Sequence, residues 1–186
     1  PAFLQGLVYL QIGSHDHCGQ SFLMKPTVQH FHHTDSGTLS YVVSDGASGC
    51  AAVVDPVLGF SVVSGRTDTV QADKILEYLQ KHDLTVEWLL ETHAHADHLS
   101  GAQYLKTQGG GKVAIGRGIT KVQAHFGKIF NLGTSFDANG SQFDHLFDDG
   151  ESFNIGNMVC SVMHTPGHTN DSVSYIIGDC VFIGDS

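Results

Sequence analysis

The strongest constraint on this chain is a histidine-rich string, HAHADH, at residues 93–98. The string follows residues 85–92, a run typical of a strand buried on at least one face, and precedes a short helix predicted over residues 100–107. A strand-to-helix loop lies at the carboxyl end of a sheet, where α/β folds usually build their sites. The string therefore indicates a functional site at one edge of a sheet.

Four of the six side chains in the string are of types that bind metal ions. His93 and His95 lie two residues apart, so both imidazoles point to the same side of an extended backbone. Asp97 and His98 follow one turn later and can face the same cavity from the start of the helix. The alanines between these residues leave room for an ion. The bland alternative is a set of solvated histidines on a loop, which the buried strand and the packed helix on either side make weak.

Two later segments carry further ligand-type side chains. In HTPGHT, residues 164–169, a strand ends at His164, a Pro-Gly turn follows, and His168 projects from the turn. In the segment IGD, Asp185 comes directly after a strand predicted over residues 180–183. A lone histidine is more often structural than a ligand, but the three segments together predict a metal site.

The rest of the pattern indicates a layered α/β fold. The clearest helix spans residues 68–82 and starts with a capping-box-like pair, Asp68 and Gln71. Its apolar stripe consists of Ala72, Ile75, Leu76 and Leu79. A strand before this helix and the strand at 85–92 after it predict a βαβ unit with a parallel strand pair. The other predicted elements are strands at 39–43, 51–55, 112–115, 151–155, 158–164 and 172–177, a helix at 119–126, and a long loop at 127–150.

Composition limits the partners and the compartment. The 186 residues include 9 Lys+Arg and 19 Asp+Glu, a formal charge of −10, so nucleic acid and anionic membrane surfaces are poor partners. No apolar run approaches the length of about 20 residues that spans a bilayer. The four cysteines stand far apart without a CxxC pair, so we expect a reduced, cytoplasmic setting, with Cys160 and Cys180 in the core.

The N-terminal residues differ in character from the rest of the chain. Met24-Lys25-Pro26 is typical of a native start, and the piece before it has no clear place in the pattern described above. We therefore expect an N-terminal extension over residues 1–23, with a non-native origin as a hypothesis, and one domain over residues 24–186.

Taken together, THAHADH, TPGHT and a GD after a short strand resemble the metallo-β-lactamase superfamily, from about residue 39 to the end. The resemblance implies a four-layer αββα sandwich with a metal centre at its edge. It also implies that Asp55 supports the loop at residues 93–98 (the metal loop) through hydrogen bonds rather than as a ligand. Members of the family continue beyond the point where this chain stops, so we expect that the C-terminal part of the domain is missing.

Within that superfamily the chain is most similar to bacterial persulfide dioxygenases, including those called β-lactamase-like hydrolases. The similarity is carried by residues 93–105 and 119–147. Glyoxalase II enzymes share the metal residues, but they usually carry two glycines after the motif, where this chain has LSGA at residues 99–102.

The resemblance to persulfide dioxygenases implies one Fe(II) per chain, held by His93, His168 and Asp185. A face of two histidines and one carboxylate leaves three coordination positions open for substrate and O2. The implied reaction oxidises a small-molecule persulfide, such as glutathione persulfide, to sulfite and thiol. The groups that orient ligands and substrate through hydrogen bonds would be His95 and, as the catalytic pair, Asp97 and His98.

The same residues also fit a different enzyme, a glyoxalase II-like hydrolase of acylglutathione thioesters with two Zn(II) ions. The ligands would be His93, His95 and His168 for one zinc and Asp97 and His98 for the other, with Asp185 bridging. Two-metal members add a further C-terminal histidine, and this chain has none after His168. A third, non-enzymatic interpretation is a binding module. The oligomeric state stays open, with a homodimer as one option.

Overall fold

The computed structural model describes residues 9–11 and 25–186. The predicted boundary between an extension over residues 1–23 and a domain from residue 24 lies outside the described residues. One short piece of the expected extension is described, the strand β1 (Tyr9–Gln11). It pairs antiparallel with β14 (Cys180–Phe182) and thereby forms the edge of a sheet.

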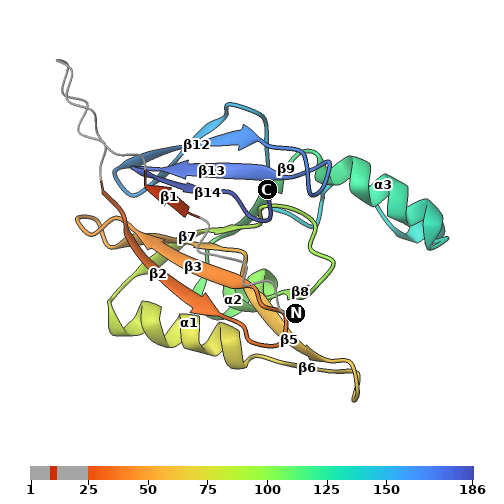
Figure 1. The fold of residues 1–186 in the computed structure, drawn as a ribbon, viewed down its shortest axis with the longest axis horizontal. Coiled ribbons are helices and arrows are strands. Elements are labelled where there is room, and N and C mark those ends of the chain that lie inside the picture. Colours follow the sequence, from red (N-terminus) through yellow and green to blue (C-terminus); the bar gives the residue numbers. More distant parts are fainter. Residues whose placement is uncertain (1–8, 12–24) are drawn as a thin grey trace.

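Two β-sheets lie face to face at the centre of the molecule (Figure 1). The larger sheet has the order β10-β9-β7-β4-β3-β2 and the smaller one β1-β14-β13-β12-β11. The strands of the larger sheet are β2 (Thr27–His32), β3 (Leu39–Ser44), β4 (Cys50–Val54), β7 (Thr85–Leu90), β9 (Lys112–Gly116) and β10 (His145–Phe147). The smaller sheet adds β11 (Ser152–Ile155), β12 (Met158–His164) and β13 (Val173–Ile177). A short third sheet consists of β5 (Val57–Ser61), β6 (Arg66–Asp68) and β8 (Leu99–Ser100).

The core between the two large sheets follows from the burial pattern of the strands. β11 and the first part of β12 alternate between buried and more exposed residues, because only one face of the smaller sheet packs against a neighbour. β3 and β4 are buried almost throughout, because the larger sheet is covered on both faces. The largest fully buried side chains include Phe147, Tyr175 and Phe182, which belong to the core between the sheets.

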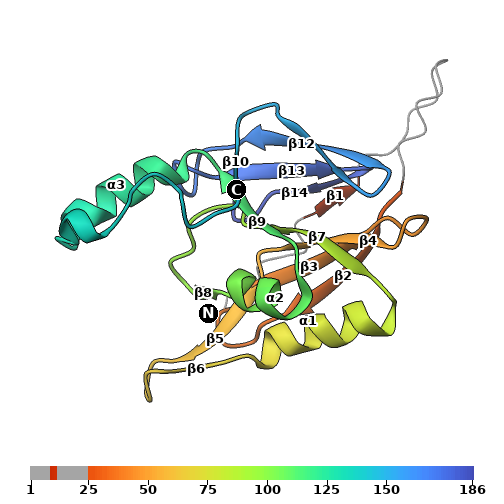
Figure 2. The same ribbon diagram turned by 180° about the vertical axis from the view of Figure 1, so that it is seen from behind.

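Two helices cover the outer face of the larger sheet (Figure 2). These are α1 (Val70–Lys81), which buries the predicted stripe residues Ala72, Ile75 and Leu79, and α2 (Ala102–Gly109). A third helix, α3 (Ile119–Ile129), projects away from the sheets (Figure 1). Among the described residues no helix covers the outer face of the smaller sheet. The layered α/β architecture is therefore confirmed, with three of the four predicted layers formed by the described residues.

The βαβ prediction is confirmed, because β4 and β7 pair in parallel on either side of α1. The capping-box prediction is wrong. The helix begins at Val70, its N-cap residue Thr69 makes no side-chain cap bond, and Gln71 is buried without a hydrogen-bond partner for Nε2. Asp68 still accepts a hydrogen bond from the Val70 N–H at 3.1 Å, so one half of the pattern retains a role.

The long loop predicted over residues 127–150 is also partly wrong. Helix α3 continues to Ile129, a 3₁₀ turn follows at Gly133–Ser135, and β10 adds to the larger sheet by parallel pairing with β9. A three-residue strand has too little sequence pattern to be recognised by alternation alone. No helix in the described ranges is long and apolar enough to cross a membrane.

Candidate metal centre

The candidate site lies where the parallel strands β4 and β7 end next to each other. Asp55 follows β4 directly, and Glu91 and Thr92 follow β7. Asp55 has a φ of 47°, in the left-handed region that Asp tolerates better than most residues. Its carboxylate accepts hydrogen bonds from the Thr92 backbone N–H at 2.7 Å and from the Thr92 hydroxyl at 2.8 Å. The expected role of Asp55, supporting the metal loop by hydrogen bonding, agrees with these contacts.

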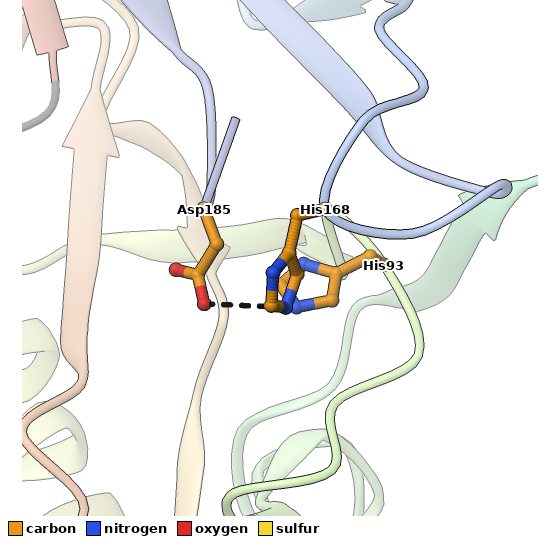
Figure 3. A group of neighbouring side chains, drawn as sticks. All are labelled: His93, His168 and Asp185. Atoms are coloured by element: carbon orange, nitrogen blue, oxygen red, sulfur yellow. Dashed lines mark ion pairs between the residues drawn. The ribbon is translucent and has the colours of Figure 1, made fainter.

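Three ligand-type side chains from remote segments meet at this edge (Figure 3). The ligand atoms of His93, His168 and Asp185 all lie within 4.8 Å of one another. His168 Nε2 is 3.6 Å from Asp185 Oδ2, and the rings of His93 and His168 have centroids 5.0 Å apart. His93 is buried, whereas the side chains of His168 and Asp185 are 48% and 32% exposed. The group is therefore anchored on its buried side and open to solvent on the other.

The protonation of His93 follows from its neighbours. The Thr92 hydroxyl has a single proton, and the acceptor-only carboxylate of Asp55 takes it. The hydroxyl oxygen, 2.9 Å from His93 Nδ1, must therefore accept a hydrogen bond from an Nδ1–H. Burial and the charge of His95 lower the pKa of His93, which favours the neutral ring. A neutral His93 with its proton on Nδ1 presents the lone pair of Nε2 to the group in Figure 3.

The residues of this group fit a divalent transition metal. His93 Nε2 is buried and has no hydrogen-bond partner, which is costly for a nitrogen lone pair unless a cation or a donor meets it. Two imidazoles and one carboxylate form the donor set of mononuclear non-haem Fe(II) sites, and zinc accepts the same atom types.

His95, whose ring centroid lies 4.1 Å from that of His93, has different partners. Its Nε2 is 3.0 Å from Asp55 Oδ1 and 3.2 Å from Glu91 Oε2, both on buried carboxylates. Burial alone would lower the pKa of His95. The negative charges of Asp55 and Glu91, and the hydrogen bonds that His95 makes with them, outweigh the effect of burial and raise the pKa to about 11. Burial likewise opposes ionisation of Asp55, but the charge of His95 and the hydrogen bonds lower its pKa.

Asp97 is exposed, whereas His98 is half-buried. Asp97 Oδ2 accepts a hydrogen bond from the Thr38 hydroxyl at 3.1 Å, and Asp97 Oδ1 is 4.0 Å from His95 Nδ1. His98 donates from Nδ1 to its neighbour's carbonyl, while its Nε2 is buried without a partner. His95, Asp97 and His98 form a second group that could hold a metal ion. The two residues do not lie at a helix start as predicted, because β8 separates them from α2.

A cavity of about 570 Å³ opens beside the second group. This volume lies within the range of pockets that hold small organic ligands. The walls of the cavity are the metal loop, the turn at residues 33–36 and the β5–β6 hairpin. The residues that line it include His33, Asp35, Leu58, Phe60, Val62, Asp97, His98 and Leu99. A second cavity of about 40 Å³ lies between the sheets, next to Asp55, His95 and Asp185.

Sequence reasoning missed three residues of this region. Glu91 precedes the motif directly, but only the fold shows that its carboxylate turns inward to His95 and accepts a hydrogen bond from the Ser100 hydroxyl. Thr38 and Asp171 are remote from the motif in sequence and contact it through single hydrogen bonds. A buried Asp in a turn has no recognisable sequence signal. Cys160 and Cys180 are core residues, as predicted.

Comparison with known sequences yields one family. The sequence profile of the metallo-beta-lactamase superfamily matches residues 33–186. A beta-lactamase hydrolase-like protein of Xylella fastidiosa is 48% identical over 164 residues, which are 88% of this chain and 38% of that protein. Glyoxylase B2 of Dictyostelium discoideum is 45% identical over 164 residues, which are 87% of this chain and 56% of that protein. The chain thus spans only 38% and 56% of the length of these relatives.

Solved structures point the same way. The crystal structure of ETHE1 from Myxococcus xanthus matches the fold with a TM-score of 0.60 and 26% sequence identity. The match covers 82% of this chain and 54% of that chain.

Proposed function

The chain belongs to the metallo-beta-lactamase superfamily, and from that premise we propose that it is a persulfide dioxygenase with one Fe(II) held by His93, His168 and Asp185. The predicted resemblance to the superfamily is confirmed by the match over residues 33–186. Among its relatives, the name beta-lactamase hydrolase-like belongs to the group that the motif resembles most.

One observation carries the proposal: among the described residues, the ligand atoms of His93, His168 and Asp185 meet at the sheet edge as two imidazole nitrogens and one carboxylate oxygen. His95, the histidine that would complete a three-histidine zinc site, directs Nε2 to Asp55 and Glu91. Its remaining nitrogen lies on the side of Asp97. Mononuclear Fe(II) centres use this donor set, which supports the proposal of iron at this site.

His93, His168 and Asp185 would hold the ferrous iron, which would supply the activation of O2 for the overall reaction of persulfide, O2 and water to sulfite, thiol and two protons. The chain's own residues orient a proposed ligand and leave space for the substrate. Asp55 and Thr92 fix the ring of His93, and the 570 Å³ cavity beside Asp97 offers space for the organic part of the substrate. Glutathione persulfide is the substrate we propose first.

A second candidate is a two-zinc thioester hydrolase. Its specific support is the second group of ligand-type side chains, where His98 Nε2 is buried without a partner. The relative named glyoxylase B2 points in the same direction.

Metal analysis combined with two assays separates the candidates. The chain is purified without added metal, its iron and zinc are counted, and O2 uptake with glutathione persulfide is compared with hydrolysis of an acylglutathione thioester. About one iron per chain with persulfide-dependent O2 uptake is the expected result. Two zinc ions per chain with thioesterase activity and no O2 uptake would overturn the proposal.

A further inference from the structure

Three hydrogen bonds connect the segment after β7 to β13 and the turn before it, across the two sheets. The Tyr175 hydroxyl donates to the Glu91 carbonyl at 2.8 Å, and the Val173 N–H donates to the Thr92 carbonyl at 2.9 Å. The third bond comes from the Ala94 N–H to the side chain of Asp171 at 3.0 Å. Of these three connections, only the last is made by a carboxylate.

Asp171 is a costly residue at this position. It is fully buried, Oδ2 accepts the bond from Ala94, and Oδ1 has no hydrogen-bond partner. An apolar side chain would avoid the desolvation of that second oxygen, because a buried polar atom without a partner lowers stability. The one contact that offsets this cost is the hydrogen bond from the Ala94 N–H.

The backbone of Asp171 is held from its other side by the start of α3. A Cβ at Gly118 would lie 2.8 Å from Asp171 Cα, which shows how closely the two backbones approach. A side chain at position 118 would therefore displace the backbone of Asp171.

The position of Ala94 makes this bond important for the candidate metal centre. Ala94 lies between His93 and His95, and His168 lies three residues before Asp171 in the turn that precedes β13. The bond therefore joins the two loops that carry the imidazoles of His93 and His168, whose centroids are 5.0 Å apart.

We propose that Asp171 is a positioning residue for the metal centre: through the Ala94 N–H it sets the separation of the loops that carry His93 and His168. The inference rests on the metal centre of the proposed function. The loss of hydrogen-bonded groups that orient ligands typically weakens metal affinity 10- to 100-fold. Asp171 bonds the backbone of the loop that carries His93 and does not bond a ligand side chain directly.

The test compares truncated and conservative variants of the full chain. Asp171→Ala removes the acceptor, and Asp171→Ser leaves a hydroxyl too short to reach Ala94. Asp171→Asn keeps an acceptor oxygen without the charge. Asp45→Ala is the matched control. Asp45 is a buried aspartate directly after the C-terminal end of β3, and it accepts a hydrogen bond from the Asn157 N–H. It therefore joins the same two sheets at a different place.

The affinities for Fe(II), under anaerobic conditions, and for Zn(II) are measured by competition with a chelator. The third readout is the melting temperature of the metal-free protein. We expect affinity to fall about 10- to 100-fold in Asp171→Ala and Asp171→Ser and to stay close to that of the unmodified chain in Asp171→Asn. Asp45→Ala is expected to lower the melting temperature without changing metal affinity. Unchanged affinity in both truncations, or equal losses in Asp171→Asn and Asp171→Ala, would overturn the proposal.

The failure of one proposal can be told apart from the failure of the other. The metal preference and the persulfide-dependent O2 uptake of the unmodified chain test the function. The ratio of affinities between variants tests Asp171 for whichever ion the chain binds.

Discussion

Replacing Asp55 by Asn tests whether a chain of hydrogen bonds fixes the proton of His93. Asp55 Oδ2 accepts from the Thr92 hydroxyl, and the hydroxyl oxygen accepts from His93 Nδ1, so that Nε2 keeps its lone pair. Asn has the same shape and tolerates the positive φ of 47° at this position. Its amide oxygen can take the place of Oδ1, but its NH2 group replaces the acceptor Oδ2 by a donor.

The magnitude follows from the two ways in which Thr92 can respond. If its hydroxyl turns to donate to His93 Nδ1, the ring proton moves to Nε2 and the metal-facing lone pair is lost. If the hydroxyl keeps accepting from Nδ1, its own proton is buried without an acceptor, which costs about 1–3 kcal/mol. Because about 1.4 kcal/mol corresponds to a factor of ten, we expect metal affinity to fall about 10- to 100-fold.

The assay measures Fe(II) affinity by chelator competition and the His93 tautomer in the metal-free protein by ¹⁵N NMR of the imidazole nitrogens. Asp45→Asn is the control, because Asp45 is a buried aspartate whose carboxylate accepts two backbone N–H bonds far from the site. A variant Asp55→Asn with unchanged affinity and the proton still on Nδ1 would refute the reasoning.

Three further outcomes follow from the same geometry. His168→Ala should lose the bound metal and change the free energy of unfolding of the metal-free chain by no more than about 0.5 kcal/mol, because the side chain is half exposed; full metal occupancy in this variant would contradict the ligand assignment. Gly184→Ala should destabilise the metal-free chain by about 1–2 kcal/mol in urea unfolding, since Gly184 has a φ of 56° and an added Cβ would collide with Thr92. Burial raises the pKa of Cys160 to about 12, so its thiol stays protonated at pH 8 and iodoacetamide should label half-buried Cys50 before Cys160; peptide mass spectrometry that finds Cys160 labelled equally fast would contradict this order.

Much of the fold could be predicted because the relevant signals are local. The stripe of α1 and the strand–helix–strand order around it are properties of neighbouring residues, and the structure confirms both. β10 could not be predicted, because three residues become a strand only through pairing with the distant β9. Helix α3 extends beyond its predicted end with Ile129 largely exposed, so no burial pattern marked that last turn.

In the candidate site, too, local signals could be predicted from the sequence and contacts between remote residues could not. The spacing of the motif and the turn before His168 predicted which side chains could come together. The sequence left open how His95 is used, since that depends on Glu91 turning inward and on Asp55 arriving from a neighbouring strand. Asp171 lies 77 residues from its partner Ala94, and no local pattern connects the two.

Charge explains why this loop suits a cation even though most of its carboxylates are not ligands of the proposed ion. Asp55, Glu91 and Asp171 are all buried behind the loop, and His95 is the cation that contacts the first two. Formally these four side chains carry −3 + 1 = −2 when ionised, in a region where burial weakens solvation. The proposed ligand Asp185 brings the formal charge to −2 − 1 = −3, and a divalent ion held by Asp185 and neutral His93 would offset most of it. The hydrogen bonds that Asp55 and Asp171 accept hold the ligand loops in place. At Asp171, removing the acceptor is therefore expected to lower metal affinity more than removing the charge.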